Sequence, residues 1–295
     1  YRLVNGEGDQ LPGLVVDRYG RYLVVQFHTR GMEVYKQQIV AALSSICSPL
    51  GIYERSDTSV RCVEGLTSQT GVLHGTVPDL IEIRENHLRF VVDVKNGQKT
   101  GFFLDQRDKR LGLQKYVSGA RVLNCFSYSG GFSVYALAAG AEHVVNVDVS
   151  EEALELVREN IQLNGFDSQR CSCIKADVKQ YLAQPAGEHF DAVILDPPAF
   201  VKDRRHKKQG LAGYSRINRQ AFAWLHAGGT LLTCSCSHHV SRDEFVDMLI
   251  EAAGREEQTL QLLEYHGHGL DHPRLIAHKE GAYLKAIFAR VQEPG

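Results

Sequence analysis

The sequence predicts an α/β fold in which a doubly wound sheet follows a small α+β domain. From residue 121 onward, short runs rich in β-branched residues alternate with helical segments, a pattern typical of a parallel sheet covered by helices on both faces. Before about residue 95, β-rich runs are paired across short turns instead, which indicates hairpins. The polar, glycine-containing stretch 95–101 separates the two patterns. We therefore predict domains at residues 1–95 and 96–295.

The first domain is predicted from five strand-like runs and one helix. Residues 32–43 favour a helix because four apolar side chains recur at the spacing of one helical face. These side chains are Val34, Ile39, Val40 and Leu43. The predicted strands are Leu14–Asp17, Tyr22–Phe27, Ile52–Arg55, Leu80–Ile83 and Leu88–Asp93.

The second domain is predicted as a helix followed by five strands with helices between them. We expect Asp105 to cap a first helix that runs to about Tyr116. Ser150 is a good N-cap for a later helix, which Asn164-Gly165 would end. Its buried stripe would consist of Ala153, Val157 and Ile161. The predicted strands are Val122–Asn124, His143–Asp148, Cys173–Asp177, Asp191–Asp196 and Gly229–Cys234.

The amino-acid composition limits the partners and the cellular compartment that we expect for the protein. The 33 basic and 35 acidic residues give a net charge of −2, which argues against a broadly basic nucleic-acid coat. No apolar run approaches the ~18 residues that span a membrane, and the seven cysteines fit reduced thiols better than a disulfide scaffold. We expect a cytoplasmic protein. The chain has neither a secretion signal nor an initiator Met, so we also expect that an upstream segment is missing.

The first β-α turn of the second domain, Asn124–Phe132, places Gly130-Gly131 at the start of a helix. A glycine pair there lets the backbone approach a ligand, and the free N–H groups of a helix start suit an anionic group. A tight turn without a ligand is the alternative interpretation. The turn is not a dinucleotide fingerprint, because Phe126 and Tyr128 stand where glycine would be expected.

Acidic residues close three successive strands of the predicted sheet, namely Asp148, Asp177 and Asp196. Each acid alone could simply cap the helix that follows it. Because the carboxyl ends of parallel strands meet in one crevice, three acids in succession favour a nucleoside-binding site. Asp148 lies about 20 residues after the turn, where an acid can accept hydrogen bonds from ribose hydroxyls.

The third of these acids opens the sequence Asp196-Pro197-Pro198-Ala199-Phe200. Two prolines stiffen the turn and remove two backbone donors. A carboxylate, backbone carbonyls and an aromatic ring are thereby held beside the crevice. A planar base could stack on Phe200 while Asp196 or the nearby carbonyls accept hydrogen bonds from its polar edge.

Two cysteines, Cys234 and Cys236, end the last predicted strand. A thiol at the carboxyl end of a strand in such a sheet is a candidate nucleophile, although cysteine more often behaves as a small buried hydrophobe. Residues two apart in a strand point to the same side, so either thiol could reach the crevice.

A basic stretch follows the proline turn and stands out against the slightly acidic chain. Charge runs are commonly just solvated surface, but the position of this one favours contact with RNA phosphates. The residues we assign to substrate RNA are Pro197, Pro198, Phe200, Lys202, Arg204, Arg205 and Tyr214.

These motifs together resemble those of class I S-adenosylmethionine-dependent methyltransferases, whose sheet is Rossmann-like. The matching positions are Asn124–Phe132, Asp148, Asp177, Asp196–Phe200 and Ser235-Cys236-Ser237. More narrowly, the chain resembles the bacterial 23S ribosomal RNA cytosine-C5 methyltransferases that carry an N-terminal PUA domain, which would precede Tyr1. This second resemblance is carried by Leu11–Arg18, Lys99–Arg107, Asp271-His272-Pro273 and Glu280–Lys285.

The resemblance implies a cofactor, a partner and residue roles. S-adenosyl-L-methionine would be the cofactor, and 23S ribosomal RNA or an assembling large subunit would be the partner. Cys236 would be the nucleophile, since it occupies the Ser-Cys-Ser position of the family. Better-known RNA cytosine methyltransferases have a second cysteine where this chain has Ala199, so Asp196 would assist as base instead. The turn would lie against the methionine part of the cofactor, Asp148 would bind its ribose and Asp177 would lie by the adenine. The full predicted cofactor set is Gln106, Arg107, Asn124, Phe126, Ser127, Tyr128, Ser129, Gly130, Asp148, Asp177 and Asp196.

Other interpretations remain open at this point. The protein could be a nucleobase N-methyltransferase acting on ribosomal RNA, because an Asp-Pro-Pro-aromatic turn also suits an amino-group substrate. It could also be a non-catalytic, cofactor-binding ribosome assembly factor. We expect no metal, because His266-Gly267-His268 lacks companion ligands at a recognised spacing. Cys171-Ser172-Cys173 begins a strand away from the crevice and is expected to be structural. A homodimer is a further prediction.

Overall fold

The computed structural model describes residues 1–201 and 203–292 and divides the chain into two compact units. The first unit consists of Tyr1–Arg107 and His268–Gly281, and the second of Asp108–Gly267 and the chain from Ala282 onward. The division falls later than the predicted 95/96 boundary, and a distant segment joins the first unit.

Hydrogen bonds explain why the segment 268–281 belongs to the first unit. The backbone N–H of Arg2 donates to Asp271 at 3.0 Å, and the Arg107 guanidinium donates to both carboxylate oxygens of Asp271. The Asn5 side chain donates to the carbonyl of Pro273 at 2.8 Å. These contacts join residues more than 160 positions apart in the chain, so local sequence patterns do not reveal them.

The first unit is built on a five-stranded sheet with the order β1-β2-β3-β4-β5, in which only β3 and β4 are parallel. Its core gathers apolar residues of β2, β3 and β4 with Leu43 of a helix. The sheet strands are β1 (Arg2–Asn5), β2 (Leu14–Tyr19), β3 (Tyr22–Phe27), β4 (Gly51–Ser56) and β5 (Gln69–Gly75), and β6 (Leu80–Glu85) and β7 (Leu88–Asp93) form a separate ribbon. The helices are α1 (Arg30–Val34), α2 (Lys36–Cys47) and α3 (Val60–Val63).

The predicted helix 32–43 is two helices that meet at Tyr35. Tyr35 departs from helical dihedral angles. Val34 is exposed whereas Leu43 is buried, so the predicted apolar face was wrong at Val34. The first strand, β1, and the edge strand β5 carried no prediction. Both are short or largely exposed, so a buried pattern is weak in their sequences.

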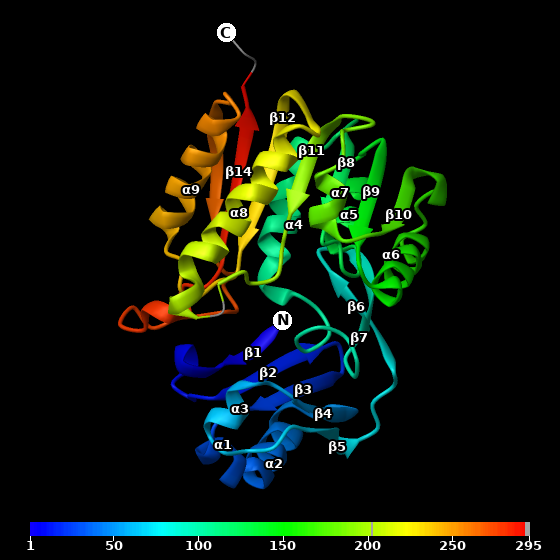
Figure 1. Cartoon of the computed structure of the whole chain (residues 1–295). Helices are drawn as coiled ribbons and strands as arrows, with labels where there is room; N and C mark the ends of the chain where they lie inside the picture. Colours follow the sequence, from blue (N-terminus) through cyan, green and yellow to red (C-terminus); the bar gives the residue numbers. More distant parts are fainter. Residues whose placement is uncertain (202, 293–295) are drawn as a thin grey trace. The chain divides into compact units, whose positions relative to one another are not determined.

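The second unit contains a seven-stranded sheet with the order β10-β9-β8-β11-β12-β14-β13, shown in Figure 1. The first five strands in this order are parallel, and β14 is antiparallel to both neighbours. The five predicted strands are parallel, as expected, whereas β13 and β14 carried no prediction. The strands are β8 (Arg121–Cys125), β9 (His143–Asp148), β10 (Cys171–Lys175), β11 (Phe190–Leu195), β12 (Leu225–Ser235), β13 (Leu260–His266) and β14 (Lys285–Val291).

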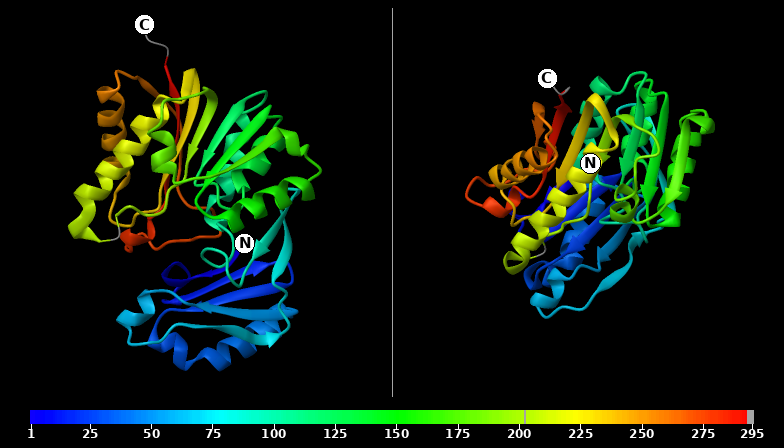
Figure 2. Two further views of the ribbon diagram at one scale, coloured as in Figure 1. Left: turned by 45° about the vertical axis from the view of Figure 1, so that its right-hand side comes forward. Right: turned by 45° about the horizontal axis from the view of Figure 1, so that its top comes forward.

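Helices cover both faces of this sheet, as predicted. Buried residues of α7, α8 and α9 pack with alternate strand residues such as Leu123 and Leu231 in one core, and α8 and α9 lie side by side in both views of Figure 2. Helices α5 and α6 contact β8, β9 and β10. The helices are α4 (Arg107–Leu113), α5 (Gly131–Ala138), α6 (Glu151–Leu163), α7 (Val178–Leu182), α8 (Lys207–Phe222) and α9 (Arg242–Arg255).

Helix α6 follows the predicted start and stop. The Ser150 hydroxyl accepts from the backbone N–H of Ala153, and Gly165 has a left-handed φ of 72° after the last turn. The predicted stripe of Ala153, Val157 and Ile161 is buried. The helix predicted from Asp105 differs, because Asp105 lies inside a short 3-10 turn, Leu104–Gln106, that precedes α4.

Helices within residues 1–201 and 203–292 are all too short or too polar to span a membrane.

Candidate active site

The carboxyl ends of the five parallel strands bring the predicted chemistry to one edge of the second unit's sheet. Asp148 is the last residue of β9, Asp196 directly follows β11, and Cys236 directly follows β12. Asp177 follows β10 by two residues. Because these strands are parallel, the three acids and the thiol share this edge.

The turn after β8 has an unusual backbone. Phe126, Tyr128 and Gly130 have left-handed φ angles of 59°, 46° and 75°, a conformation that costs energy for residues other than glycine. The Asp148 carboxylate stabilises the turn, since it accepts from the backbone N–H of Tyr128 at 2.9 Å and from that of Ser150 at 3.1 Å. Asp148, the residue predicted to bind the ribose of the cofactor, is thus held in place by the turn that is predicted to bind the methionine part of the same cofactor.

Two hydroxyl groups in this turn are buried without a partner in the described part of the chain. They are the Oγ atoms of Ser127 and Ser129. A buried polar group that lacks a hydrogen bond is costly, and it is commonly satisfied by a bound ligand or water. This pair therefore fits the amino or carboxylate end of S-adenosylmethionine, for which the turn was predicted.

Asn124 contributes to the framework behind the turn. Its amide donates to Ser133 Oγ of α5 at 2.8 Å and to Asn146 Oδ1 of β9 at 3.4 Å. Asn124 and Asn146 are also partners in the β8–β9 register. These contacts show that Asn124 joins β8, β9 and α5, and its predicted contact with the cofactor stays a prediction.

Asp177 caps a helix as well as standing at the strand edge. Its side chain accepts from the backbone N–H of Gln180 in the first turn of α7 at 3.0 Å, and the residue is exposed. The capping alternative is thus observed, and the predicted contact with adenine stays a prediction.

The two cysteines at the end of β12 differ in exposure. Cys234 is completely buried and pairs in register with Ala286 of β14. Cys236 is half-buried, and its Sγ lies 3.9 Å from the carbonyl oxygen of Pro197. Cys236 is therefore the thiol beside the Asp-Pro-Pro turn, a distinction that sequence spacing alone could not make.

Tyr214 supports, from inside the protein, the segment Ser235–Ser237 that carries Cys236, which we call the thiol loop. Its hydroxyl lies 2.9 Å from Ser237 Oγ and accepts weakly from the backbone N–H of Phe200 at 3.4 Å. Ser237 Oγ also accepts from the N–H of Val201 at 3.1 Å. Burial raises the pKa of Tyr214. Because Tyr214 is fully buried, its predicted contact with RNA is corrected to a supporting role.

Phe200 is half-buried against this network. Its ring centroid is 4.7 Å from that of Tyr214, and the Lys179 ammonium lies over the Phe200 ring at 4.5 Å. A base that stacked on the Lys179 side would have to displace that ammonium. Pro198 is exposed beside this ring, whereas Pro197 is buried.

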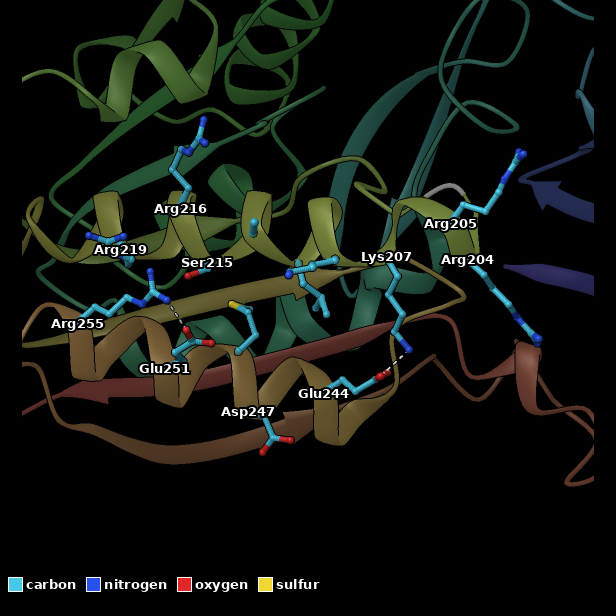
Figure 3. Close-up of a pocket in the computed structure, with 14 residues that line it drawn as sticks. Arg204, Arg205, Lys207, Ser215, Arg216, Arg219, Glu244, Asp247, Glu251 and Arg255 are labelled. Carbon is cyan, nitrogen blue, oxygen red and sulfur yellow. Dashed lines mark hydrogen bonds and ion pairs between the residues drawn. The ribbon is translucent and has the colours of Figure 1, made fainter.

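Basic side chains line a groove of about 850 Å³ between α8 and α9 (Figure 3). Some are paired within the groove, as Lys207 is with Glu244 and Arg255 with Glu251. Arg216 points away from α9 in Figure 3, and Arg204 and Arg205 are exposed at the start of α8. Lys202 lies outside the described residues. The predicted basic stretch therefore lines one side of a groove that carries both charges, with more cations than anions among its lining residues.

Gln106 and Arg107 lie in the first unit. Gln106 is buried, and Arg107 forms an ion pair with Asp271 at 2.9 Å. Burial acts to raise the pKa of Asp271, but hydrogen bonds from His272, the Arg2 backbone and Arg107 hold it well below the ordinary value. The observed role of Arg107 is to fasten the segment 268–281, and its role toward a cofactor stays a prediction.

Lys285 ends the Glu280–Lys285 motif, and no role was predicted for it from the sequence. Its position in the structure places it behind Cys236. It begins β14 opposite Ser235 of β12 and is completely buried. A charged residue at a strand start resembles solvated surface, so nothing local in the sequence marks it as buried. No group of three or more potential metal ligands occurs among the described residues.

Comparisons with known proteins place the chain in a class of enzyme. A sequence model of the S-adenosylmethionine-dependent methyltransferase family matches residues 65–290. In structure, a Streptococcus mutans protein described provisionally as a SAM-dependent methyltransferase has a TM-score of 0.86 at 26% identity, with 99% of this chain and 74% of that one covered. A second solved structure, also described provisionally as a methyltransferase and determined with SAH, has a TM-score of 0.87 at 26% identity and coverages of 99% and 75%. The chain belongs to this methyltransferase family, and its cofactor is S-adenosylmethionine.

Closer relatives narrow the family. Proteins named ribosomal RNA large subunit methyltransferase I from Aeromonas salmonicida and Aliivibrio fischeri are each 45% identical, and one from Escherichia coli O157:H7 is 40% identical. Each match covers 99% of this chain and 74% of the relative. The chain therefore belongs to the family of ribosomal RNA large subunit methyltransferases, which excludes the non-catalytic alternative.

Proposed function

We propose that this enzyme forms 5-methylcytosine in 23S ribosomal RNA and that Cys236 is its covalent nucleophile. The observation that carries the proposal is the half-buried Cys236 thiol, 3.9 Å from the Pro197 carbonyl in the Asp-Pro-Pro turn. The names of the relatives support a ribosomal RNA substrate. An enzyme of this kind acts where ribosomes assemble, which supports the cytoplasm as its location.

Methylation at carbon 5 of cytosine needs covalent help, because that carbon is a poor nucleophile. The Cys236 thiolate adds to C6 of the base, and the electron pair of the C5–C6 double bond then forms a bond to the methyl carbon, while the bond from that carbon to sulfur breaks and leaves its electron pair on sulfur. A base removes the C5 proton, the C–H electrons restore the double bond, and the thiolate leaves. Asp196, directly after β11 and next to Pro197, is our candidate for this base.

The cofactor supplies an electrophilic methyl group on a sulfonium. In our proposal, the turn from Phe126 to Gly130 holds its methionine part, with the buried hydroxyls of Ser127 and Ser129 as partners. Asp148, fixed by two backbone N–H groups, takes the ribose. Methyl transfer from a sulfonium needs no metal.

Substrate RNA would be bound through phosphates near the start of α8. Arg204 and Arg205 are exposed there, and further cations line the groove between α8 and α9. Cationic side chains in such a position bind phosphates without reading sequence. The target cytosine must be unpaired or flipped to reach the thiol.

Replacement of each cysteine in turn tests the proposal. We expect Cys236→Ala to lower transfer of labelled methyl to ribosomal RNA by roughly 10⁴-fold or more, as loss of a covalent nucleophile does. The matched control Cys234→Ala removes a buried thiol two residues away and should keep activity. Nucleoside mass spectrometry should identify the product as 5-methylcytosine, and RNA containing 5-fluorocytosine should trap a covalent complex through Cys236.

The rival chemistry is methylation of an exocyclic or ring nitrogen, which the Asp196–Phe200 turn also suits and which needs no thiol. Full activity of Cys236→Ala, with an N-methylated nucleoside as product, would establish the rival and exclude the covalent mechanism. Sedimentation of the purified enzyme tests the predicted homodimer separately.

A further inference from the structure

Lys285 places a positive charge inside the second unit, directly behind the thiol loop. It faces Ser235 across the β12–β14 pair, and its side chain is completely buried. The ammonium donates to the carbonyl of Ser237 at 2.6 Å and to that of Tyr283 at 2.7 Å. Ser237 is the residue after Cys236, so the lysine fixes the backbone that carries the thiol.

This buried ammonium has no carboxylate within ion-pair distance among residues 1–201 and 203–292. Carbonyl oxygens satisfy two of its three donors, but they leave its charge uncompensated. Glu244, which attracts it at longer range, is itself paired with Lys207 at 2.5 Å. A buried charge without a partner is expensive and is kept only where something compensates it.

The group that can supply the missing negative charge is the thiol itself. Burial lowers the pKa of Lys285 to about 8, and the charges of Cys236 and Glu244 act in the opposite direction. Cys236 and Lys285 are therefore close enough to influence each other's ionisation. At neutral pH the lysine is still mostly protonated, so it favours the ionised form of the thiol.

We propose that Lys285 is a positioning residue for Cys236: its buried ammonium anchors the Ser237 carbonyl and provides the charge that stabilises the Cys236 thiolate. This inference rests on the proposed role of Cys236 as nucleophile. When the thiolate forms, the S–H proton passes to solvent, the bonding electron pair stays on sulfur, and Lys285 keeps its three protons.

Other titratable groups face the same loop and must be held constant in a test. Tyr214 of α8 is influenced by Cys236, although burial is the main cause of its raised pKa. Asp196 follows β11, Glu244 lies in α9, and the His238 ring lies 5.2 Å from that of Tyr283. A substitution at Lys285 leaves all of these groups in place, so a change in the reactivity of Cys236 reports on the lysine.

The test measures the reactivity of the thiol rather than methyl transfer. The full chain is treated with iodoacetamide between pH 6 and 10, and alkylation of each cysteine is followed by peptide mass spectrometry. Cys62, exposed on α3, is the internal reference. We expect Lys285→Met to slow alkylation of Cys236 about tenfold at pH 7, as a pKa shift of about one unit does, and to leave Cys62 unchanged. Lys285→Arg should restore most of the reactivity.

Equal rates for Cys236 in the wild type and Lys285→Met would overturn the proposal. If Lys285→Met does not fold, the wild-type profile decides: Cys236 should ionise at a lower pH than Cys62, and ionisation at the same or a higher pH overturns the inference. Failure of this inference is distinguishable from failure of the proposed function, because alkylation measures the ionisation of Cys236 whereas the activity of Cys236→Ala measures its catalytic role.

Discussion

The two ends of the candidate active site are built differently, although both lie on one edge of the same sheet. At the β8–β9 end, Asp148 is held by two backbone N–H groups and three residues of the adjacent turn have left-handed φ angles. At the β12 end, a single buried ammonium and a tyrosine hydroxyl hold the loop that carries Cys236. The first end is organised by hydrogen bonds from the backbone, and the second by side chains reaching from α8 and β14.

This difference matches what each end would have to do. The amino-acid end and the ribose of the cofactor do not react, so they are best bound by a turn whose donors and acceptors are fixed in advance. A nucleophile must instead change its charge and bond during the reaction, which nearby charges control. We therefore expect substitutions at one end to affect cofactor affinity and substitutions at the other to affect thiol reactivity.

The largest expected effect in this comparison is at Asp148. Asp148→Ala removes an acceptor that serves the N–H groups of Tyr128 and Ser150 as well as the predicted ribose contact. Hydrogen bonds to charged groups contribute ~1.5–3 kcal/mol each, so the Kd for S-adenosylmethionine should rise about 100-fold by calorimetry. Alkylation of Cys236 should keep its wild-type rate.

Asp177→Ala is the matched control, because Asp177 occupies the next strand end but is exposed and caps α7. It should cost about 1 kcal/mol of unfolding free energy through loss of the cap and change the Kd less than Asp148→Ala. An equal rise in Kd for both variants would mean that the preformed turn at Asp148 confers no advantage in cofactor binding.

A smaller effect is expected at the opposite end from Tyr214→Phe. The change removes the hydroxyl that lies 2.9 Å from Ser237 Oγ and leaves that serine with one fewer buried partner. We expect a loss of about 1–2 kcal/mol in unfolding free energy, an altered rate of Cys236 alkylation and an unchanged cofactor Kd. Tyr181→Phe, on a ring that stacks on Trp224 in the same core, is the control. A raised cofactor Kd in Tyr214→Phe would show that the two ends are coupled.

Local sequence patterns predicted most of this edge. The five parallel strands, the caps of α6 and the positions of three acids follow from periodicity and from residue types at strand ends. Tyr214 could also have been placed correctly, because it precedes Ile217 and Ala221 at helical spacing, and all three are buried. Its position after a basic stretch suggested contact with RNA instead.

What sequence could not predict depends on contacts between distant residues. Strand β14 inserts antiparallel between β12 and β13, and only this pairing brings Lys285 behind Cys236. Likewise, Asp271 binds Arg2 across 269 positions, so the segment 268–281 joins a unit that its sequence neighbours do not. Family resemblance identified both segments as motifs but gave no physical reason for them.

The smallest expected effects concern the turn hydroxyls and test whether they are present for the cofactor. Ser127 and Ser129 have buried Oγ atoms without a partner in the described part of the chain, so Ser→Ala at either position removes an unsatisfied polar atom from the cofactor-free protein. We expect the melting temperature of that form to stay the same or rise slightly, and the cofactor Kd to rise about fivefold, as one hydrogen bond of ~1 kcal/mol implies.

Ser133→Ala is the contrasting control: its hydroxyl is bonded to Asn124 and Asn146, so it should lose stability without a specific loss of affinity. A stability loss at Ser127 or Ser129 with unchanged Kd would instead show that these hydroxyls support the turn itself, and the two ends of the site would then be organised by the same means.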